Sequence, residues 1–367
     1  MNYCKQIAYT YYTSPKADFD VMLDDVLKQI STDGIILRLV CWCSPSDNQE
    51  YEQWLLAYRH RIYQTFIERV PGSALVAQTP LGCGMVLEVQ TYYPTNDDVV
   101  SYKKYDKLPY VLVENSLGRF LFASGFHGSG LLSTATLQAD AAFEHLVSLL
   151  QVEGFSLSSI TRQWNYIERI TELDGEDQRY QSFNNVRADY YATDNWINGY
   201  PAATGIGASF GGVCIDVDAV LPVTKLCVIT PIDNRLQVAA HAYSSGVILC
   251  SGHKKYSPKF ERAKMVSLDD GSKLIYVSGT AAIRGEESLE GVGLSKQLEV
   301  TLENIAQLTE DVPLRHVRVY LKASSDYEET ARLLDEKLPN VTKAYLEANV
   351  CRDALLIEIE GIAQNNN

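Results

Sequence analysis

Three consecutive segments decide the fold class: SKLIYVSGTAAI at residues 272–283, SKQLEVTLENIAQLTE at 295–310 and HVRVYLKASSDYEETARLLDEKLP at 316–339. The first has the short, β-branched apolar run of a strand, whereas the second repeats apolar residues at intervals of three and four, as an amphipathic helix does. The third predicts a strand, a turn and a helix. The C-terminal half therefore alternates strands with helices.

The first half of the chain repeats this pattern. Strands are predicted at 35–43 (IILRLVCWC), 84–93 (GMVLEVQTYY) and 110–125 (YVLVENSLGRFLFASG), and helices at 48–70 and 134–154. Neither half has a long βαβ succession or a glycine-rich phosphate loop. We therefore expect an α+β protein with two similar halves, each a mixed sheet with helices packed on one face.

Composition and charge restrict the class of function. The 367 residues are 46% hydrophobic and 21% charged, with a net charge of −14, which favours two globular domains and argues against a nucleic-acid partner. An acidic protein still binds a small anion where a few arginines converge. The eight cysteines form no CxxC pair, the opening MNYCKQIAYTYY is too polar for a signal peptide, and no apolar run approaches membrane-spanning length. We therefore expect a cytoplasmic protein without a membrane role.

The middle of the chain, from about 164 to 209, is rich in tyrosine and poorly periodic, and we interpret it as a functional insertion or loop layer. Three ordered blocks around it, RQWNYIERI (162–170), RYQSFNNVRADYY (179–191) and YPAATGIGASFGG (200–212), resemble the chorismatase family. The likeness continues through the C-terminal 200 residues, whose blocks are NRLQVAAHAY (234–243), SPKFERA (257–263), YVSGTAAIRGEES (276–288) and LEANVCRDALLIEIEG (346–361). The last blocks also resemble the wider Rid/YjgF fold, whose members include imine deaminases.

Two features depart from the family pattern. Asn185 and Val186 precede Arg187 where the family commonly carries a glycine, and the N-terminal 120 residues match only loosely. Both leave room for an altered substrate.

The resemblance implies an architecture and an activity. It implies two Rid/YjgF-like (chorismate-mutase-like) halves: a degenerate N-terminal domain at 1–160, a connecting pocket segment at 161–212 and a catalytic domain at 213–367. The family cleaves the enolpyruvyl ether of chorismate, a small dianion, to pyruvate and either a hydroxybenzoate or a dihydroxycyclohexadiene carboxylate, without metal or cofactor. Rid-like units commonly pack around a threefold axis, so a homotrimer or an internal pseudo-oligomer is expected by analogy.

The resemblance makes Glu358, in the closing strand LLIEIEGIA (355–363), the general acid. A carboxyl group in a partly apolar pocket has the raised pKa that proton donation to the enol ether requires. Strand alternation puts Ile357 and Ile359 on one side and Glu358 and Glu360 on the other. The structural alternative is that both glutamates face solvent.

Two positions mark the subtype of product, and they disagree. Cys351 matches the position where hydroxybenzoate-forming members carry cysteine, whereas Ala263 stands where that type tends to carry glycine. The sequence favours 3-hydroxybenzoate through Cys351. Without the resemblance, Cys351 would be interpreted as an inert buried thiol.

Arg187 and Arg262 are the predicted carboxylate clamps, because both lie in matched blocks and a guanidinium group pairs with a planar anion through two bonds. Arg352 and Arg169 are secondary candidates. Tyr180 and Tyr200 are predicted hydrogen-bond donors, although most of the 23 tyrosines must serve packing.

Two other functions compete with this prediction. A Rid-type imine deaminase needs an arginine shortly before the final strand, a region where the sequence offers Lys343. A non-catalytic Rid-like protein would bind a metabolite in the same pocket and lose no turnover when Glu358 is replaced.

Overall fold

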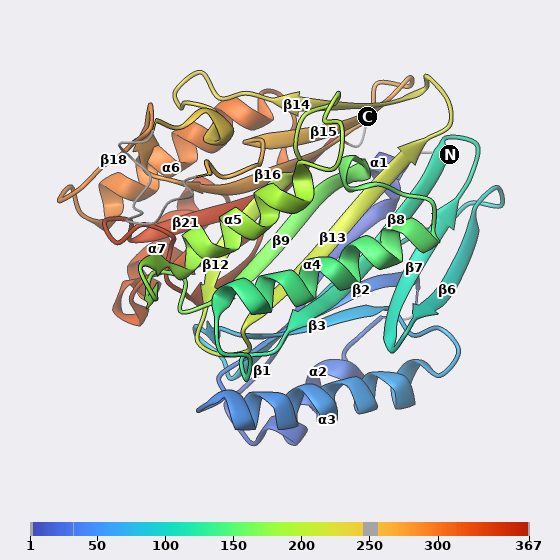
Figure 1. Ribbon diagram of the computed structural model, residues 1–367, viewed down its shortest axis with the longest axis horizontal. Helices are drawn as coiled ribbons and strands as arrows, with labels where there is room; N and C mark the ends of the chain where they lie inside the picture. Colours follow the sequence, from blue (N-terminus) through green and yellow to red (C-terminus); the bar gives the residue numbers. More distant parts are fainter. Residues whose placement is uncertain (1–2, 32, 245–255, 366–367) are drawn as a thin grey trace.

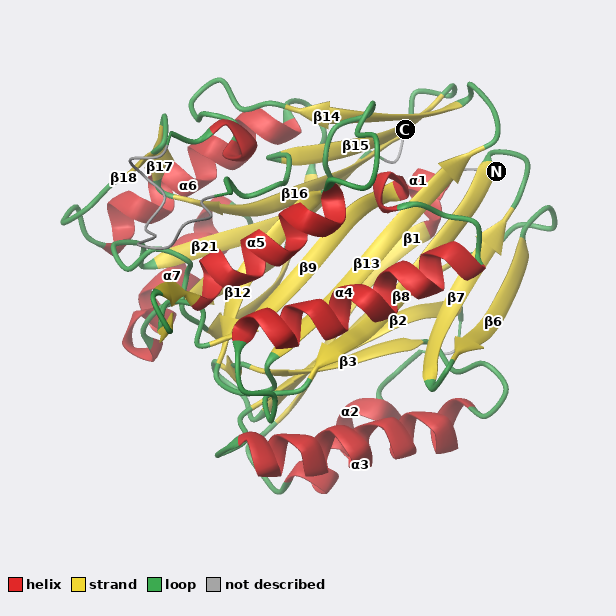
Figure 2. Cartoon of the chain, viewed as in Figure 1, coloured by secondary structure: helices red, strands yellow, loops and turns green. Residues whose placement is uncertain are grey.

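The computed structural model describes residues 3–31, 33–244 and 256–365; Cys250 lies outside them. Within these residues the chain is α+β, and its long strands form three mixed sheets with helices on their outer faces (Figures 1 and 2). The predicted fold class, mixed sheets covered by helices on one face, is confirmed. None of the described helices has the length and apolarity to span a bilayer.

The N-terminal sheet has the strand order β1-β5-β2-β3 and is covered by α2 and α3. Its core contains Leu39, Cys41, Tyr58 and Leu87, all fully buried. The elements are α1 (Tyr3–Gln6), β1 (Ile7–Ser14), α2 (Phe19–Lys28), β2 (Ile35–Cys43), α3 (Asn48–Phe66), β3 (Gly72–Ala77) and β5 (Met85–Tyr92).

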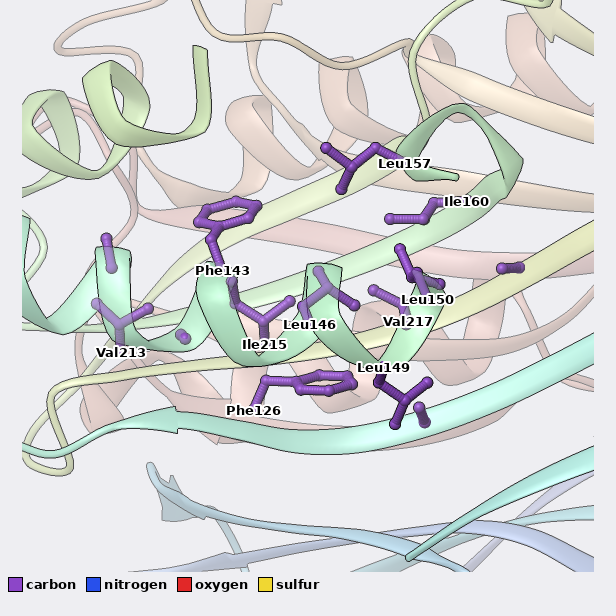
Figure 3. Close-up of a cluster of buried hydrophobic side chains, with 14 of the residues drawn as sticks. Phe126, Phe143, Leu146, Leu149, Leu150, Leu157, Ile160, Val213, Ile215 and Val217 are labelled. Carbon is purple, nitrogen blue, oxygen red and sulfur yellow. The ribbon is translucent and has the colours of Figure 1, made fainter. Parts of the chain in front are cut away.

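The central sheet has the order β12-β9-β13-β8-β7-β6. Helix α4 packs on it through Phe143, Leu146 and Leu150, which meet Ile215 and Val217 of β13 (Figure 3). Its elements are β6 (Val99–Tyr105), β7 (Leu108–Glu114), β8 (Gly118–Gly128), α4 (Ala135–Val152), β9 (Ile160–Glu168), α5 (Arg179–Tyr191), β12 (Ala202–Ala208) and β13 (Val213–Pro222).

The C-terminal sheet has the order β14-β15-β16-β21-β19-β20, which matches the central sheet taken from its other edge, β6-β7-β8-β13-β9-β12. In both sheets the last of the six strands in the chain lies between the third and the fourth. The C-terminal sheet also has the short β4 (Thr79–Pro80) at its edge. Helix α6 packs Leu298, Ile305 and Leu308 against Ile357 and Ile359 of β21. The elements are β14 (Cys227–Ile232), β15 (Ala263–Leu268), β16 (Lys273–Ala281), α6 (Leu294–Thr309), β19 (Leu314–Leu321), α7 (Tyr327–Lys337), β20 (Thr342–Glu347) and β21 (Ile357–Gln364). Two short ribbons, β10–β11 (Leu173–Asp174, Asp177–Gln178) and β17–β18 (Ile283–Arg284, Glu287–Ser288), complete the strands.

A ring of buried ion pairs joins the three sheets. Each sheet contributes one arginine and one carboxylate, and each arginine bonds the carboxylate of a different sheet. The pairs are Arg38 with Asp218 (2.6 Å), Arg162 with Glu360, and Arg318 with Glu88 (2.6 Å). Arg318 also reaches Glu360 at 2.9 Å. Because all six side chains are at most 3% exposed, this ring fixes the sheets relative to one another where little water screens the charges.

The segment 164–209 differs from the expected loop layer, since it contains most of β9, α5 and β12. Helix α5 lacks an apolar periodicity because it buries Gln181, Asn184 and Arg187 together with Phe183. The boundary predicted at residue 160 falls inside the central sheet, after the first residue of β9. The division into domains stays a prediction.

Candidate active site

The central and C-terminal sheets meet at the contact between β12 and β16, two strands labelled in Figure 1. A pocket lined by residues of both strands lies at this contact. It encloses about 790 Å³, including its open mouth. The inner wall comes from α5, β12, β16 and β21 and is lined by Tyr180, Gln181, Asn184, Ala203, Gly205, Gly279, Ala281 and Glu358. The outer wall is lined by Gln178, Tyr243, Pro258, Phe260, Arg262, Ile283, Cys351, Arg352 and Leu355.

Glu358 projects into this pocket from β21. Its neighbours Ile357 and Ile359 point the other way, into the core under α6, as strand alternation requires. The register of β16 against β21 shifts between Val277 and Thr280, and this bulge brings the backbone of Gly279 against the Glu358 carboxyl group. Glu358 and Glu360 are 5% and 2% exposed, so the alternative in which both face solvent is wrong.

The surroundings of Glu358 favour its protonated form. Burial raises its pKa to about 8, the negative charge of Glu360 adds to the rise, and Arg262 and Arg162 oppose it. Arg162 is already bonded to Glu360, which also accepts from Trp164 Nε1 at 3.1 Å. Arg162 is therefore paired with Glu360, the two arginines offset the effect of burial only in part, and Glu358 keeps a proton at neutral pH that it can donate.

Cys351 lies beside Glu358, in the segment between β20 and β21. Burial raises the pKa of its thiol to about 12, with a further contribution from Glu358. The thiol is therefore protonated at neutral pH, and it acts as a neutral wall of the pocket and not as a thiolate nucleophile.

Two arginines meet at one aromatic ring on the outer wall. The guanidinium carbon of Arg262 lies 5.5 Å from the ring centre of Tyr243, and that of Arg352 lies 5.1 Å from it. Arg262 donates to the Tyr243 hydroxyl and to the Val238 carbonyl, whereas Arg352 donates to the Glu286 carbonyl at 2.7 Å. Both side chains are held by neutral oxygens, which leaves their charge available to an anion.

The remaining predicted residues lie outside the pocket wall. Arg187 is fully buried behind Asn184, Tyr200 packs between Trp196 and Tyr191, and Arg169 is half exposed beside Glu168 and Glu172. Ala263 faces the core under α6, because it follows Arg262 in an extended segment and so points to the opposite side. The pocket thus brings together Glu358, Cys351, Arg262, Arg352 and Tyr180.

Several pocket residues were not singled out from the sequence. Asn184 and Gln181 lie in the block with Tyr180, Phe260 precedes Arg262 by two residues, and Gly279 lies in the YVSGTAAI block. The sequence blocks that contain these residues were matched to the family. The only signal for the residues themselves was their helical or strand spacing from a predicted site residue, which could have placed them on the same face.

Comparison with known proteins identifies the family. Residues 113–219 match the family model described as chorismatase FkbO/Hyg5-like, N-terminal. A 3-hydroxybenzoate synthase of Streptomyces hygroscopicus is 30% identical over 269 residues, which are 67% of this chain and 74% of the relative. This chain belongs to the chorismatase family. A chorismatase of Streptomyces rapamycinicus is 29% identical over 60% of this chain and 68% of its own.

The fold of the whole chain agrees with this membership. A chorismatase crystal structure superposes with a TM-score of 0.67 at 19% identity and covers 98% of this chain and 99% of its own. The likeness to chorismatases inferred from the middle and C-terminal blocks is therefore confirmed, and it extends in fold to the loosely matching N-terminal 120 residues.

Proposed function

We propose that this chorismatase-family protein is an enzyme that cleaves the enolpyruvyl ether of chorismate, with Glu358 as the general acid. The observation that carries the proposal is a buried carboxyl group, with its pKa raised to about 8, in a pocket that also presents Arg262 and Arg352. Relatives named chorismatase and 3-hydroxybenzoate synthase support the same substrate.

Substrate binding follows from the two walls. Arg262 and Arg352 bind a carboxylate, while Phe260, Leu355 and Ile283 contact the cyclohexadiene ring. This places the enolpyruvyl group toward Glu358. Tyr180 supplies a neutral hydroxyl from α5, since burial raises its pKa far above neutrality.

Glu358 then transfers its proton to the methylene carbon of the enolpyruvyl group. When water attacks the resulting oxocarbenium-like carbon, a hemiketal forms; the bond between that carbon and the ether oxygen then breaks, the ring keeps this oxygen as a hydroxyl, and the products are pyruvate and a dihydroxycyclohexadiene carboxylate. When the neighbouring ring hydroxyl attacks, a cyclic ketal forms; the bond from that hydroxyl oxygen to the ring then breaks, the oxygen leaves in pyruvate, and loss of a ring proton gives a hydroxybenzoate that keeps the former ether oxygen, without net water. The Glu358 carboxylate is reprotonated before the next turnover.

We favour 3-hydroxybenzoate as the aromatic product, which would feed secondary metabolism. Cys351 borders the pocket next to Glu358, whereas Ala263, the marker that points the other way, faces the core. The thiol occupies space that an attacking water would need. The relative named 3-hydroxybenzoate synthase supports the same product.

The compartment and assembly are proposed as well. We place the protein in the cytoplasm, acting on a small anion and without a nucleic-acid partner. The shared strand order of the central and C-terminal sheets, and the ion-pair ring between three sheets, support an internal pseudo-oligomer over a homotrimer.

A substrate assay tests the function. Purified protein is incubated with chorismate, pyruvate is followed with lactate dehydrogenase and NADH, and the ring product is identified by chromatography. Pyruvate in equimolar amount with 3-hydroxybenzoate is expected. No pyruvate release by folded protein would refute the proposal.

One observation favours imine deamination as a second candidate. Arg352 lies shortly before β21 and lines the pocket, so it meets the requirement of a deaminase for an arginine in this region. Lys343 does not meet it, because this residue of β20 donates to Asp335 at 2.9 Å. An assay distinguishes the two functions: an amino-acid oxidase generates imines in the reaction mixture, and semicarbazide traps them as semicarbazones. A deaminase hydrolyses the imine first and lowers semicarbazone formation, whereas a chorismate-cleaving enzyme leaves it unchanged.

A further inference from the structure

Helix α5 carries a buried pair, Asn184 and Arg187, at the pocket wall. Both side chains are 1% exposed, and Arg187 Nη2 donates to Asn184 Oδ1 at 2.6 Å. They are three positions apart in the sequence, so they lie on the same face of the helix. Asn184 lines the pocket, whereas Arg187 lies one layer behind it and packs over the Phe183 ring at 5.3 Å.

This contact fixes the orientation of the Asn184 amide. A guanidinium group has donors and no acceptor, so the amide atom that faces Arg187 must be the carbonyl oxygen. The NH₂ group of Asn184 then points away from Arg187. Among the described residues its Nδ2 is buried without a hydrogen-bond partner. A buried donor without a partner costs stability unless a ligand satisfies it.

The Asn184 side chain also faces Tyr180, one helical turn earlier on α5. The Tyr180 ring is seated against Gly205, where a Cβ would lie 2.8 Å from the ring, and burial raises the pKa of the Tyr180 hydroxyl, so this group is a neutral donor. Asn184 and Tyr180 thus present two neutral donors to the pocket from α5, whereas Arg262 and Arg352 line it from other segments of the chain.

We propose that Arg187 is a positioning residue: it holds Asn184 Oδ1 so that the Asn184 NH₂, together with the Tyr180 hydroxyl, donates to the substrate carboxylate that Arg262 and Arg352 do not bind. This rests on the proposed function and assigns the recognition of the second carboxylate of a dicarboxylate substrate. It also replaces the sequence-based prediction that Arg187 clamps the substrate itself.

Asn184→Asp is the decisive variant. It keeps an oxygen, now charged, against Arg187, so the melting temperature should equal or exceed that of the wild type, but it removes the donor from the pocket. We expect kcat/KM for pyruvate release from chorismate to fall by about 10- to 100-fold, as expected for the loss of one hydrogen bond to a charged group. Asn185→Asp adds the same charge one residue away, outside the pocket, and should stay within about twofold of the wild type. Wild-type activity in Asn184→Asp, or an equal loss in Asn185→Asp, would overturn the proposal.

A double-mutant cycle tests whether Arg187 acts through Asn184. Arg187→Met alone should lower kcat/KM by about tenfold, mainly through KM, because the amide is free to turn. In an Asn184→Ala background the same change should cost less than about twofold, since Arg187 then has nothing to position. A full tenfold loss in that background would mean that Arg187 binds substrate directly and would refute the positioning role.

Failure of the proposed function would be recognised separately. Wild-type protein without pyruvate release would refute chorismate cleavage alone. Titration calorimetry with isophthalate, a ring dicarboxylate that needs no turnover, would then test the inference with the same variants. Weaker binding by Asn184→Asp but not by Asn185→Asp would uphold it, and equal binding by both would refute it.

Discussion

Gly279 lies directly against the carboxyl group of Glu358, in the bulge that shifts the register between β16 and β21. A β-carbon at position 279 would overlap Glu358 Oε1 and would also lie 3.1 Å from Thr204 Cγ2. The absence of a side chain at this position therefore gives Glu358 its place on the pocket floor.

Gly279→Ala is expected to displace the acid. Because the added β-carbon would take the position of Glu358 Oε1, the carboxyl group must turn away into the pocket, so kcat should fall by tenfold or more, with a loss of stability of about 1–3 kcal/mol. Pyruvate release and thermal melting measure the two effects. Gly271→Ala strains the backbone at a φ of +82° but contacts nothing within 4 Å, so it should lose stability and keep its activity. Normal kcat in Gly279→Ala would contradict this account.

The pH dependence of stability should report Glu358. Its pKa of about 8 in the folded protein exceeds the ordinary value of 4.5, so the folded chain retains a proton that the unfolded chain releases. The free energy of unfolding should therefore fall as pH rises from about 4.5 to 8. Glu358→Gln removes this contribution, so its stability relative to the wild type should rise steadily over the same range. Urea unfolding at four pH values measures it, and a constant difference would show that the pKa of Glu358 is not raised.

The ion-pair ring should be sensitive to the loss of one member. Arg38→Met leaves Asp218 buried without its cation and should lower the free energy of unfolding by about 3 kcal/mol or more, because Arg38 and Asp218 are both fully buried. Arg38→Met combined with Asp218→Asn should recover part of this loss. The matched control, Arg332→Met, breaks an exposed pair with Glu336 and should cost less than about 0.5 kcal/mol. Equal losses in the two single variants would contradict a structural role for the ring.

The identity of the ring product should depend on Cys351. Replacing the thiol by the smaller Ala opens space beside Glu358 for a water molecule, so Cys351→Ala should shift the product from 3-hydroxybenzoate toward dihydroxycyclohexadiene carboxylate. Chromatography of the reaction mixture measures the ratio. Cys83→Ala changes a half-buried thiol outside the pocket and should leave the ratio unchanged. An unchanged ratio in Cys351→Ala would mean that the thiol does not restrict water.

The sequence predicted the α+β class, and strand alternation, which is local, put Ile357 and Ile359 on one side of β21 and Glu358 and Glu360 on the other, as the structure shows. Alternation alone did not predict that the side of the glutamates is buried, since burial comes from β9 and β12 of another sheet, which supply Arg162 and Thr204 to Glu360; only the family resemblance implied a pocket for Glu358. Helix α5 escaped recognition for the same reason. Its polar residues are buried by pocket and pair contacts that no local periodicity records.

The clamping residues show a second limit. The sequence ranked Arg187 and Arg262 together and above Arg352, because a matched block does not reveal which side of a helix or strand faces the pocket. The structure separates them: Arg262 and Arg352 line the wall, and Arg187 stands behind Asn184. Orientation of this kind depends on how the central and C-terminal sheets meet, which is a tertiary property.

The most direct test of the central claim is the rate of pyruvate release from chorismate at pH 7 by wild-type protein and by Glu358→Gln, with Glu347→Gln as a matched control outside the pocket. The account predicts turnover by the wild type and by Glu347→Gln, and a loss of at least about 100-fold in Glu358→Gln, as is typical when a general acid is removed. Pyruvate release by Glu358→Gln at the wild-type rate would contradict the assignment of Glu358 as the proton donor.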